Sequence, residues 1–210
     1  AMAMATAFTD RIKAETENED AIRVYEEYTP GDKDFSAQLE AVEKAGVKSV
    51  LLPGDNIDSI NIIKQASDMG LDVVFLGDKD WSSDEFQDLA DGVATDANTA
   101  FVNFYAADEA VNEEAEKFLK AYHEKYGENS VPEDAVALGY DSYIIALDAI
   151  DRADDDATGE EIRDVLKEER SFQGASGTIT FNTTGDPIKT AYISTWRDGE
   201  LVSIYTVDPV

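Results

Sequence analysis

The sequence predicts an α/β fold with a parallel sheet in its first half, followed by helices that have no sheet between them. Short apolar strands alternate with amphipathic helices through about the first hundred residues, which is typical of parallel strands with right-handed crossovers. Residues 105–170 then carry three helices with no buried strand between them. The chain has 210 residues, 43% of them hydrophobic, which is ample for a buried core.

Hydrophobic periodicity places the elements of the first half. Apolar residues at helical spacing predict a helix over 3–15, and the alternation in AIRVYEEY predicts a strand over 21–28. Asp34 is placed to cap the next helix, which we expect to end at Gly46. Further apolar runs predict strands over 47–53, 71–77 and 99–105, a helix that ends at Gly70 and a helix over 84–90.

The pattern of predicted elements changes in the second half of the chain. Helices are predicted over 112–126 and 133–151, and a third begins at Thr158, where Thr158 and Glu161 have capping-box spacing. The tail is β-rich: GTITFN, TAYISTW and LVSIYTV are separated by TGDP and RDGE turns. Because the three helices have wide apolar faces and no sheet within 105–170, we infer that part of the fold is absent from this chain.

Composition narrows the function classes. A formal net charge of -29 argues against nucleic acid and anionic membrane surfaces as partners, and solubility or a salty environment explains it better than a cation-binding surface. The run Asp154–Asp156 lacks the alternating spacing and central glycine of a calcium loop. The chain has no cysteine, which excludes disulfides, thiol catalysis and cysteine–zinc sites. We expect neither a metal nor a cofactor.

Segment lengths bear on export. No apolar stretch is long enough to cross a bilayer, and AMAMATAF has no basic region ahead of it as a secretory signal would. If the protein is exported, we expect this chain to be a processed or trimmed form.

A set of segments follows in order along the chain: DFSAQLEAVEKAGVKSVLLPG, IIKQASDMGL, VVFLG with a tryptophan four residues later, KFLKAYHEKYG, ALGYDSYIIALDAIDRA, FQGASGTITFNTTGDPIKTAYI and DGELV. Each segment alone is a weak signal, whereas the ordered set is specific. It resembles the type I periplasmic binding proteins, and more narrowly the branched-chain amino-acid receptors of ABC transporters.

This resemblance implies two α/β lobes joined by three crossover strands, with a ligand enclosed between them. Residues 1–104 plus 188–210 then form a nearly complete three-layer α/β lobe around the parallel sheet. Residues 105–187 form the C-terminal part of the other lobe, whose N-terminal sheet is absent from this chain. We expect the missing N-terminal fragment or a symmetry mate to cover the apolar face of 105–170.

Two predicted strand ends carry polar residues where open parallel sheets bind ligands. The first strand leads into Gly54, Asp55 and Asn56, and the second into FLGDKDW. We therefore predict ligand-binding residues at both ends: Asp55, Asn56, Asp78, Asp80 and Trp81. Loops rich in Asp and Lys are also ordinary solvated turns, and Trp81 is equally consistent with a core position.

In the resembling receptors, an acid after the second strand accepts hydrogen bonds from the ligand's α-ammonium group, which needs an acceptor once desolvated. Family sequences commonly read GGDGW where this chain reads GDKDW, so the acid has moved one place to either side and Lys79 occupies its position. Either Asp78 or Asp80 still reaches the ammonium, or Lys79 favours a ligand with an additional carboxylate. Asp55 replaces a common tyrosine, which weakens the branched-chain assignment. Tyr140 is a further candidate near the site, although Tyr140 and Asp141 also suit packing and hinge support.

The expected activity is that of a receptor rather than an enzyme. The sequence lacks GxSxG, GxxxxGK[ST] and a GxGxxG that opens a helix, and the single histidine, His123, suits a solvated helix position. The resemblance implies an amino-acid-like ligand, an ABC transporter permease as partner, and an extracellular or periplasmic location, with a lipid anchor before processing. The alternatives are a sensory domain of the same fold for a small amide or other polar solute, and a doubly wound α/β enzyme. Because the groups for the ligand carboxylate would lie in the missing region, we expect the isolated chain to bind ligand weakly or not at all.

Overall fold

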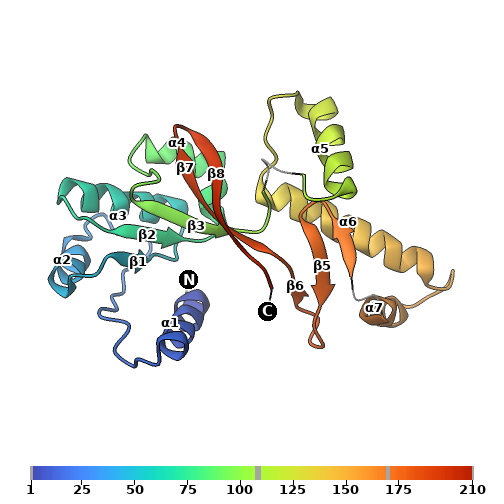
Figure 1. Cartoon of the computed structure of the whole chain (residues 1–210), viewed down its shortest axis with the longest axis horizontal. Helices are drawn as coiled ribbons and strands as arrows, with labels where there is room; N and C mark the ends of the chain where they lie inside the picture. Colours follow the sequence, from blue (N-terminus) through green and yellow to red (C-terminus); the bar gives the residue numbers. More distant parts are fainter. Residues whose placement is uncertain (1, 107–109, 169–170, 210) are drawn as a thin grey trace. The chain divides into compact units, whose positions relative to one another are not determined.

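The computed structural model describes residues 2–106, 110–168 and 171–209, which belong to two compact units (Figure 1). Unit 1 consists of Ala1–Val102 and Ser194–Val202, and unit 2 of Asn103–Ile193 and Ser203–Val210. The chain therefore passes between the units three times.

A five-stranded sheet in the order β1-β2-β3-β7-β8 organises unit 1. Its first three strands are β1 (Ser49–Leu51), β2 (Val74–Gly77) and β3 (Thr99–Asn103). They run parallel, with Val50 opposite Phe75 and Leu76 opposite Ala100, as the strand–helix alternation predicts. The strands β7 (Ala191–Arg197) and β8 (Glu200–Val207) are joined by Asp198 and Gly199, whose φ angles of 54° and 83° suit a tight hairpin turn.

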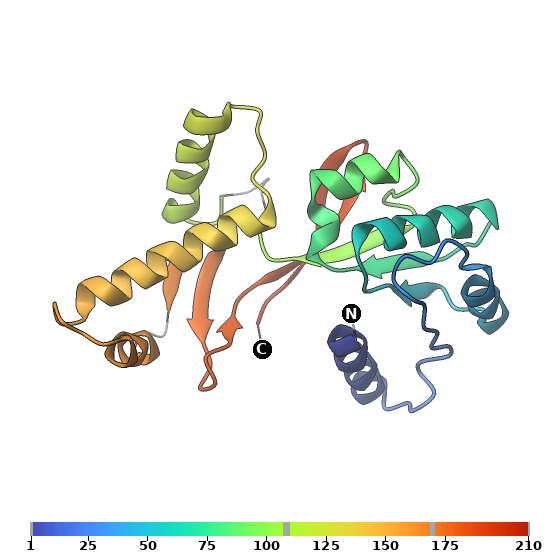
Figure 2. The same ribbon diagram turned by 180° about the vertical axis from the view of Figure 1, so that it is seen from behind.

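The predicted helices of unit 1 are present as α1 (Met2–Thr16), α2 (Ser36–Ala45), α3 (Asn56–Asp68) and α4 (Asp84–Ala90). Helices α3 and α4 pack against each other on one face of the sheet, and α1 lies on the other side with no buried residue (Figures 1 and 2). Helix α2 ends at Gly46 in the left-handed region, as predicted. Its N-cap residue is Phe35, and Asp34 instead accepts a hydrogen bond from Ser36 N at 3.0 Å.

The core of unit 1 is built around Trp81, whose side chain is 0% exposed. Its ring stacks on Phe86 with centroids 4.9 Å apart, and Trp196 Nε1 donates a hydrogen bond to the Trp81 carbonyl at 2.8 Å. Apolar side chains of α2, α3 and β2 complete the cluster. Burial of these rings fixes the turn that follows β2 against the sheet.

The prediction of a strand over 21–28 is wrong, because this segment forms no ladder with another strand. Tyr25 is exposed, and a polar contact joins the segment to α2, where Gln38 Nε2 donates to the Glu27 carbonyl at 3.1 Å. Alternating hydrophobicity sets which side chains face inward, whereas a strand also needs a neighbour for its backbone hydrogen bonds.

Unit 2 contains the predicted helices α5 (Glu113–Tyr126), α6 (Asp134–Arg152) and α7 (Gly159–Glu168). The capping box is confirmed: Thr158 N donates to Glu161 Oε2 at 2.7 Å, and Glu161 N donates to Thr158 Oγ1 at 3.4 Å. An antiparallel sheet follows, in the order β4 (Phe172–Gly174), β5 (Gly177–Phe181) and β6 (Pro187–Ile188).

Helix α6 packs against α5, α7 and the β4–β5–β6 sheet, and one of its faces stays uncovered. Ile145 packs with Phe172 and Ile179 of the β4–β5–β6 sheet, so the three helices do have a β layer of their own, supplied by residues after 170. Another face keeps large apolar side chains exposed. These side chains, here called the α6 stripe, are Val136, Tyr143 (64% exposed), Leu147 and Ile150 (53% exposed).

A buried polar network ties α6 to the neighbouring loops of unit 2. The carboxylate of Asp141 accepts hydrogen bonds from Ala175 N at 2.5 Å and from Ser176 N at 3.1 Å. Lys189 Nζ donates to the Phe104 carbonyl and to Ser176 Oγ, which in turn donates to Asp141. Burial lowers the pKa of Lys189 to about 8, although Asp141 and Asp134 act to raise it.

Lys189 makes the stability of the protein pH-dependent. Since its pKa falls from the ordinary 10.5 to about 8 on folding, the unfolded state binds more protons between these values, so stability rises with pH across that window. We expect wild type to gain about 2–3 kcal/mol relative to Lys189→Met between pH 8 and 10.5. Urea unfolding of both proteins measures the difference, and a difference that stays flat with pH would contradict the assignment.

Gly77 allows the Trp81 ring to lie against the end of β2. A Cβ at position 77 would lie 2.2 Å from the ring, so we expect Gly77→Ala to lower the unfolding free energy by about 1–3 kcal/mol. The control is Gly139→Ala within α6, where a Cβ meets nothing within 4 Å and should be neutral or slightly stabilising. Equal effects of the two substitutions in chemical denaturation would count against this packing.

Candidate ligand-binding site

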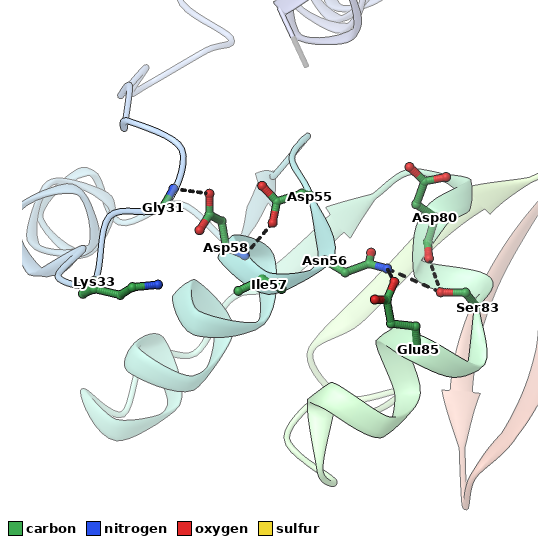
Figure 3. Close-up of a pocket in the computed structure, with 9 residues that line it drawn as sticks. All are labelled: Gly31, Lys33, Asp55, Asn56, Ile57, Asp58, Asp80, Ser83 and Glu85. Atoms are coloured by element: carbon green, nitrogen blue, oxygen red, sulfur yellow. Dashed lines mark hydrogen bonds between the residues drawn. The ribbon is translucent and has the colours of Figure 1, made fainter.

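A cavity of about 640 Å³ opens in unit 1 where the loops after β1 and β2 meet the segment 31–33 (Figure 3). Because β1 and β2 are parallel neighbours, their carboxyl ends and the loops that follow lie at the same edge of the sheet. The residues that line the cavity are Gly31, Lys33, Asp55, Asn56, Ile57, Asp58, Asp80, Ser83 and Glu85.

The loop after β1 is held by the start of α3. Asp55 is the N-cap residue, and its side chain accepts a hydrogen bond from Asp58 N at 2.9 Å. Asn56 Nδ2 donates to Glu85 Oε2 at 3.2 Å and to Ser83 Oγ at 3.4 Å, which links this loop to α4 (Figure 3). The Asn56 Oδ1 atom is shielded from solvent and has no hydrogen-bond partner among the described residues.

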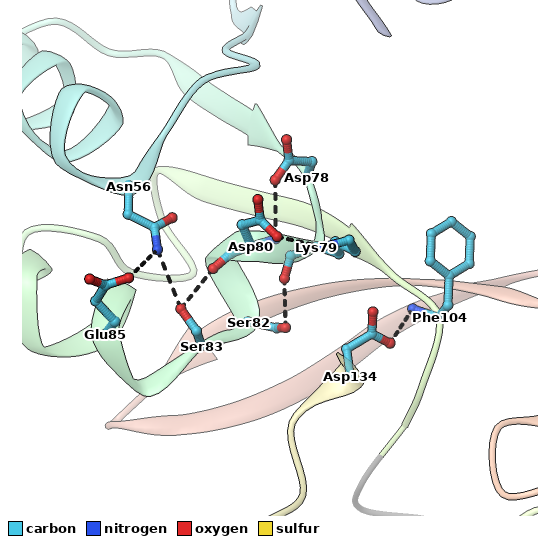
Figure 4. Close-up of polar contacts among 9 residues, drawn as sticks. All are labelled: Asn56, Asp78, Lys79, Asp80, Ser82, Ser83, Glu85, Phe104 and Asp134. Carbon is cyan, nitrogen blue, oxygen red and sulfur yellow. Dashed lines mark hydrogen bonds and ion pairs between the residues drawn. The ribbon is translucent and has the colours of Figure 1, made fainter. Parts of the chain in front are cut away.

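The loop after β2 forms the short helix η1 (Lys79–Ser82). Asp78 is its N-cap residue and accepts a hydrogen bond from Asp80 N at 3.0 Å. The carboxylate of Asp80 is about half-exposed and pairs with Lys79 Nζ at 2.5 Å (Figure 4). Ser83 then caps α4 by accepting from Phe86 N at 3.3 Å. Helix caps and turns therefore already use some of the hydrogen-bond acceptors at this edge of the sheet.

Asp58 is the buried acid of the cavity, with a relative exposure of 2%. Its Oδ2 accepts a hydrogen bond from Gly31 N at 2.9 Å, which ties the segment 31–33 to α3. The phenol of Tyr28 lies beside this group: burial raises the pKa of Tyr28, and the charges of Asp58 and Asp55 raise it further. The negative potential at this edge thus acts on a neighbouring titratable group.

Three of the predicted residues come together in the cavity lining: Asp55, Asn56 and Asp80. Asp78 lies beside them as a turn cap and is not part of the lining. Trp81 lies in the hydrophobic core, so of the two positions that the sequence allowed the structure favours the core. Whether these side chains bind a ligand stays a prediction.

Tyr140 lies in unit 2, on the face of α6 that packs against α5. Its hydroxyl donates to Glu114 Oε1 at 2.6 Å, and its ring lies 5.0 Å from that of Phe118. Burial, and then the hydrogen bond to Glu114, raise the pKa of Tyr140 to about 12. These contacts are those of a packing residue, one of the two roles considered from the sequence.

Sequence reasoning missed six lining residues: Gly31, Lys33, Ile57, Asp58, Ser83 and Glu85. Asp58 stands three residues after Asp55, the spacing of an N-terminal capping pair, and this signal could have found it. Gly31 and Lys33 belong to a loop far from the strand ends in sequence, and nothing in their immediate neighbourhood indicates where that loop folds.

Comparison with known proteins gives the family. Residues 3–200 match the periplasmic binding protein family. The chain belongs to this family. It is similar to the Leu/Ile/Val-binding protein homolog 3 of Brucella melitensis biotype 1, with 28% identity over 182 residues, covering 86% of this chain and 47% of the relative. The Leu/Ile/Val-binding protein homolog 2 of Brucella abortus is also 28% identical, over 84% of this chain and 46% of its own length.

Solved structures of binding proteins also resemble this chain in fold and sequence. The leucine binding protein LivK of Thermotoga maritima MSB8 matches with a TM-score of 0.79 and 30% identity, covering 87% of this chain and 51% of its own. The branched-chain amino acid transporter substrate binding protein LivJ of Streptococcus pneumoniae, solved with isoleucine, matches with a TM-score of 0.72 and 29% identity over the same shares. The prediction of a type I periplasmic binding protein fold is confirmed, and the chain spans about half the length of these relatives.

Within residues 2–106, 110–168 and 171–209, no three His, Cys, Asp or Glu side chains are grouped so as to hold a metal ion. None of the helices in the described part of the chain combines the length and the hydropathy that a membrane span requires.

The electrostatic link between the cavity and Tyr28 is testable by titration. Removing the charge in Asp58→Asn should lower the pKa of Tyr28 while leaving it above 10, because burial is the larger cause of the shift. ¹³C NMR of labelled tyrosine, with Tyr28→Phe to assign the signal, follows the titration. Asp68→Asn removes the same charge from the exposed far end of α3 and should leave Tyr28 unchanged. If the pKa of Tyr28 is the same in Asp58→Asn as in the wild type, the charge of Asp58 does not act on the Tyr28 phenol, which would contradict this link.

Proposed function

We propose that this chain is the ligand-binding part of a solute receptor that delivers an amino acid to an ABC transporter. The observation that carries the proposal is the cavity of about 640 Å³ at the joint carboxyl ends of β1 and β2, in a chain of the periplasmic binding protein family. Two similarities support an amino-acid ligand: one relative is named a Leu/Ile/Val-binding protein homolog, and the similar LivJ structure contains isoleucine.

Binding in this proposal depends on the acids at the two strand ends. A ligand ammonium group loses its water on binding, and a carboxylate such as that of Asp80 or Asp55 compensates by accepting its hydrogen bonds. We assign residues 1–104 plus 188–210 to one lobe and 105–187 to the other, with hinge closure enclosing the ligand. The isolated chain lacks half of this enclosure, so its affinity would be weak, on the order of millimolar.

The proposed role is non-enzymatic, and its partners follow from it. The receptor would hand its ligand to a transporter permease and act in the periplasm or outside the cell, with a lipid anchor on the precursor. The α6 stripe would be covered by another polypeptide, either the N-terminal part of the receptor or a second copy, because a helix face this apolar is costly to leave in water.

The amino-acid assignment is tested on the 210-residue chain by ¹H–¹⁵N NMR titration. L-Isoleucine and L-glutamate at millimolar concentrations should shift resonances of residues 54–58 and 78–85, whereas 3-methylpentanoate and glutarate, which lack the amino group, should not. Asp80→Asn should raise the apparent Kd of both amino acids about tenfold, because it removes a charge-assisted hydrogen bond to the ammonium group. If the deaminated acids bind as well as the amino acids, the ammonium is not what the site recognises.

Coverage of the α6 stripe is tested by light scattering. We expect the 210-residue chain to self-associate, and the double substitution Tyr143→Ser and Leu147→Ser to reduce this, because both side chains are exposed on the stripe. Tyr25→Ser with Met69→Ser replaces exposed apolar side chains of unit 1 and serves as the control. A folded wild-type chain that stays monomeric at high concentration would contradict this part of the proposal.

A further inference from the structure

The charge of the cavity lining indicates the class of ligand more narrowly. Four carboxylates line it, those of Asp55, Asp58, Asp80 and Glu85, against the single ammonium of Lys33. Ile57 is the one large apolar side chain in the lining. Sites for aliphatic ligands are lined mainly by apolar groups, so this surface is poorly matched to a leucine or isoleucine side chain.

General acidity of the chain does not explain Asp58. Acids that face solvent are expected on a chain with a net charge of -29, but Asp58 is only 2% exposed. Its single hydrogen bond as acceptor comes from Gly31 N, and no described Lys or Arg lies within ion-pair distance of it. A buried carboxylate without a cation is costly, and its second oxygen is left to accept a hydrogen bond from a ligand.

Asn56 lies beside the carboxylates in the cavity lining. Its amide nitrogen is engaged by Ser83 and Glu85, which fixes the orientation of the side chain (Figure 4). Its Oδ1 is therefore an acceptor held in place, shielded from water and without a partner among the described residues. Because solvent does not reach this atom, a bound molecule does not reach it without a movement of the side chain, and the selection of the ligand rests on Asp58.

We propose that this cavity, taken as the amino-acid site proposed above, selects amino acids with a second ammonium group, of the class of lysine and ornithine, over aliphatic amino acids. One ammonium would meet the exposed carboxylates at the two strand ends, and the other would meet the carboxylate of Asp58. Each ammonium carries three donors and no acceptor, which matches a lining rich in acceptors.

The test compares L-lysine with L-norleucine, which has the same carbon skeleton without the side-chain ammonium. NMR titration of the ¹⁵N-labelled 210-residue chain, at matched ionic strength, should give an apparent Kd for lysine at least about tenfold lower than for norleucine. The preference should shrink when NaCl is raised, because salt screens the attraction between charges. Ammonium chloride at the same concentration corrects for unspecific ionic effects.

Variants locate the second ammonium. Asp58→Asn keeps an oxygen that can accept from Gly31 N while removing the charge, and it should reduce the ratio of lysine to norleucine affinity about tenfold. Asp68→Asn, the same change at the other end of α3, should leave the ratio unchanged. Dispersion of the NMR spectrum shows directly whether each variant is folded.

The outcomes separate this inference from the proposed function. If norleucine or isoleucine binds at residues 54–58 and 78–85 as tightly as lysine, the second-ammonium proposal is overturned while the amino-acid receptor stands. Preferred binding of glutamate would overturn it in the same way, with Lys33 and Lys79 as the selecting groups. If no amino acid shifts these resonances, both proposals fail.

Discussion

The parallel pairing of β1 with β2 is the constraint on which the candidate site depends. Pairing of Ser49 with Val74 and of Leu51 with Leu76 makes the two strands end together, so the chain must leave the sheet twice at one edge. The helices that follow, α3 and α4, start at that edge and pack against each other. Their N-termini bring backbone donors and capping side chains to the place where the cavity lies.

Capping determines which polar groups remain for a ligand. Asp55, Asp78 and Ser83 each accept a backbone hydrogen bond at the start of a helix, so much of their capacity is used within the protein. Asp58 and Asn56 are different, because each retains an acceptor oxygen that no described residue satisfies. Acidic residues that look alike in the sequence therefore differ in the structure: Asp55 and Asp78 cap helices, whereas Asp58 keeps an oxygen that can accept a further hydrogen bond.

Sequence reasoning predicted what depends on local periodicity and missed what depends on long-range packing. The helices, the parallel strands and the joint strand ends of Asp55 and Asp80 follow from apolar spacing and turn residues. The core position of Trp81 depends on Phe86 and on the hydrogen bond from Trp196, far along the chain, and local pattern could not decide it. The segment 21–28 alternates like a strand yet pairs with no strand among the described residues. Gly31 and Lys33 enter the cavity through a loop that local pattern does not place.

A crystal structure of the 210-residue chain grown with an amino acid at saturating concentration tests the central claim most directly. We predict the ammonium nitrogen within about 3 Å of carboxylate oxygens in the loops after β1 and β2. An amino acid seated instead against the β4–β5–β6 sheet or the α6 stripe, with the strand-end loops empty, would contradict the account.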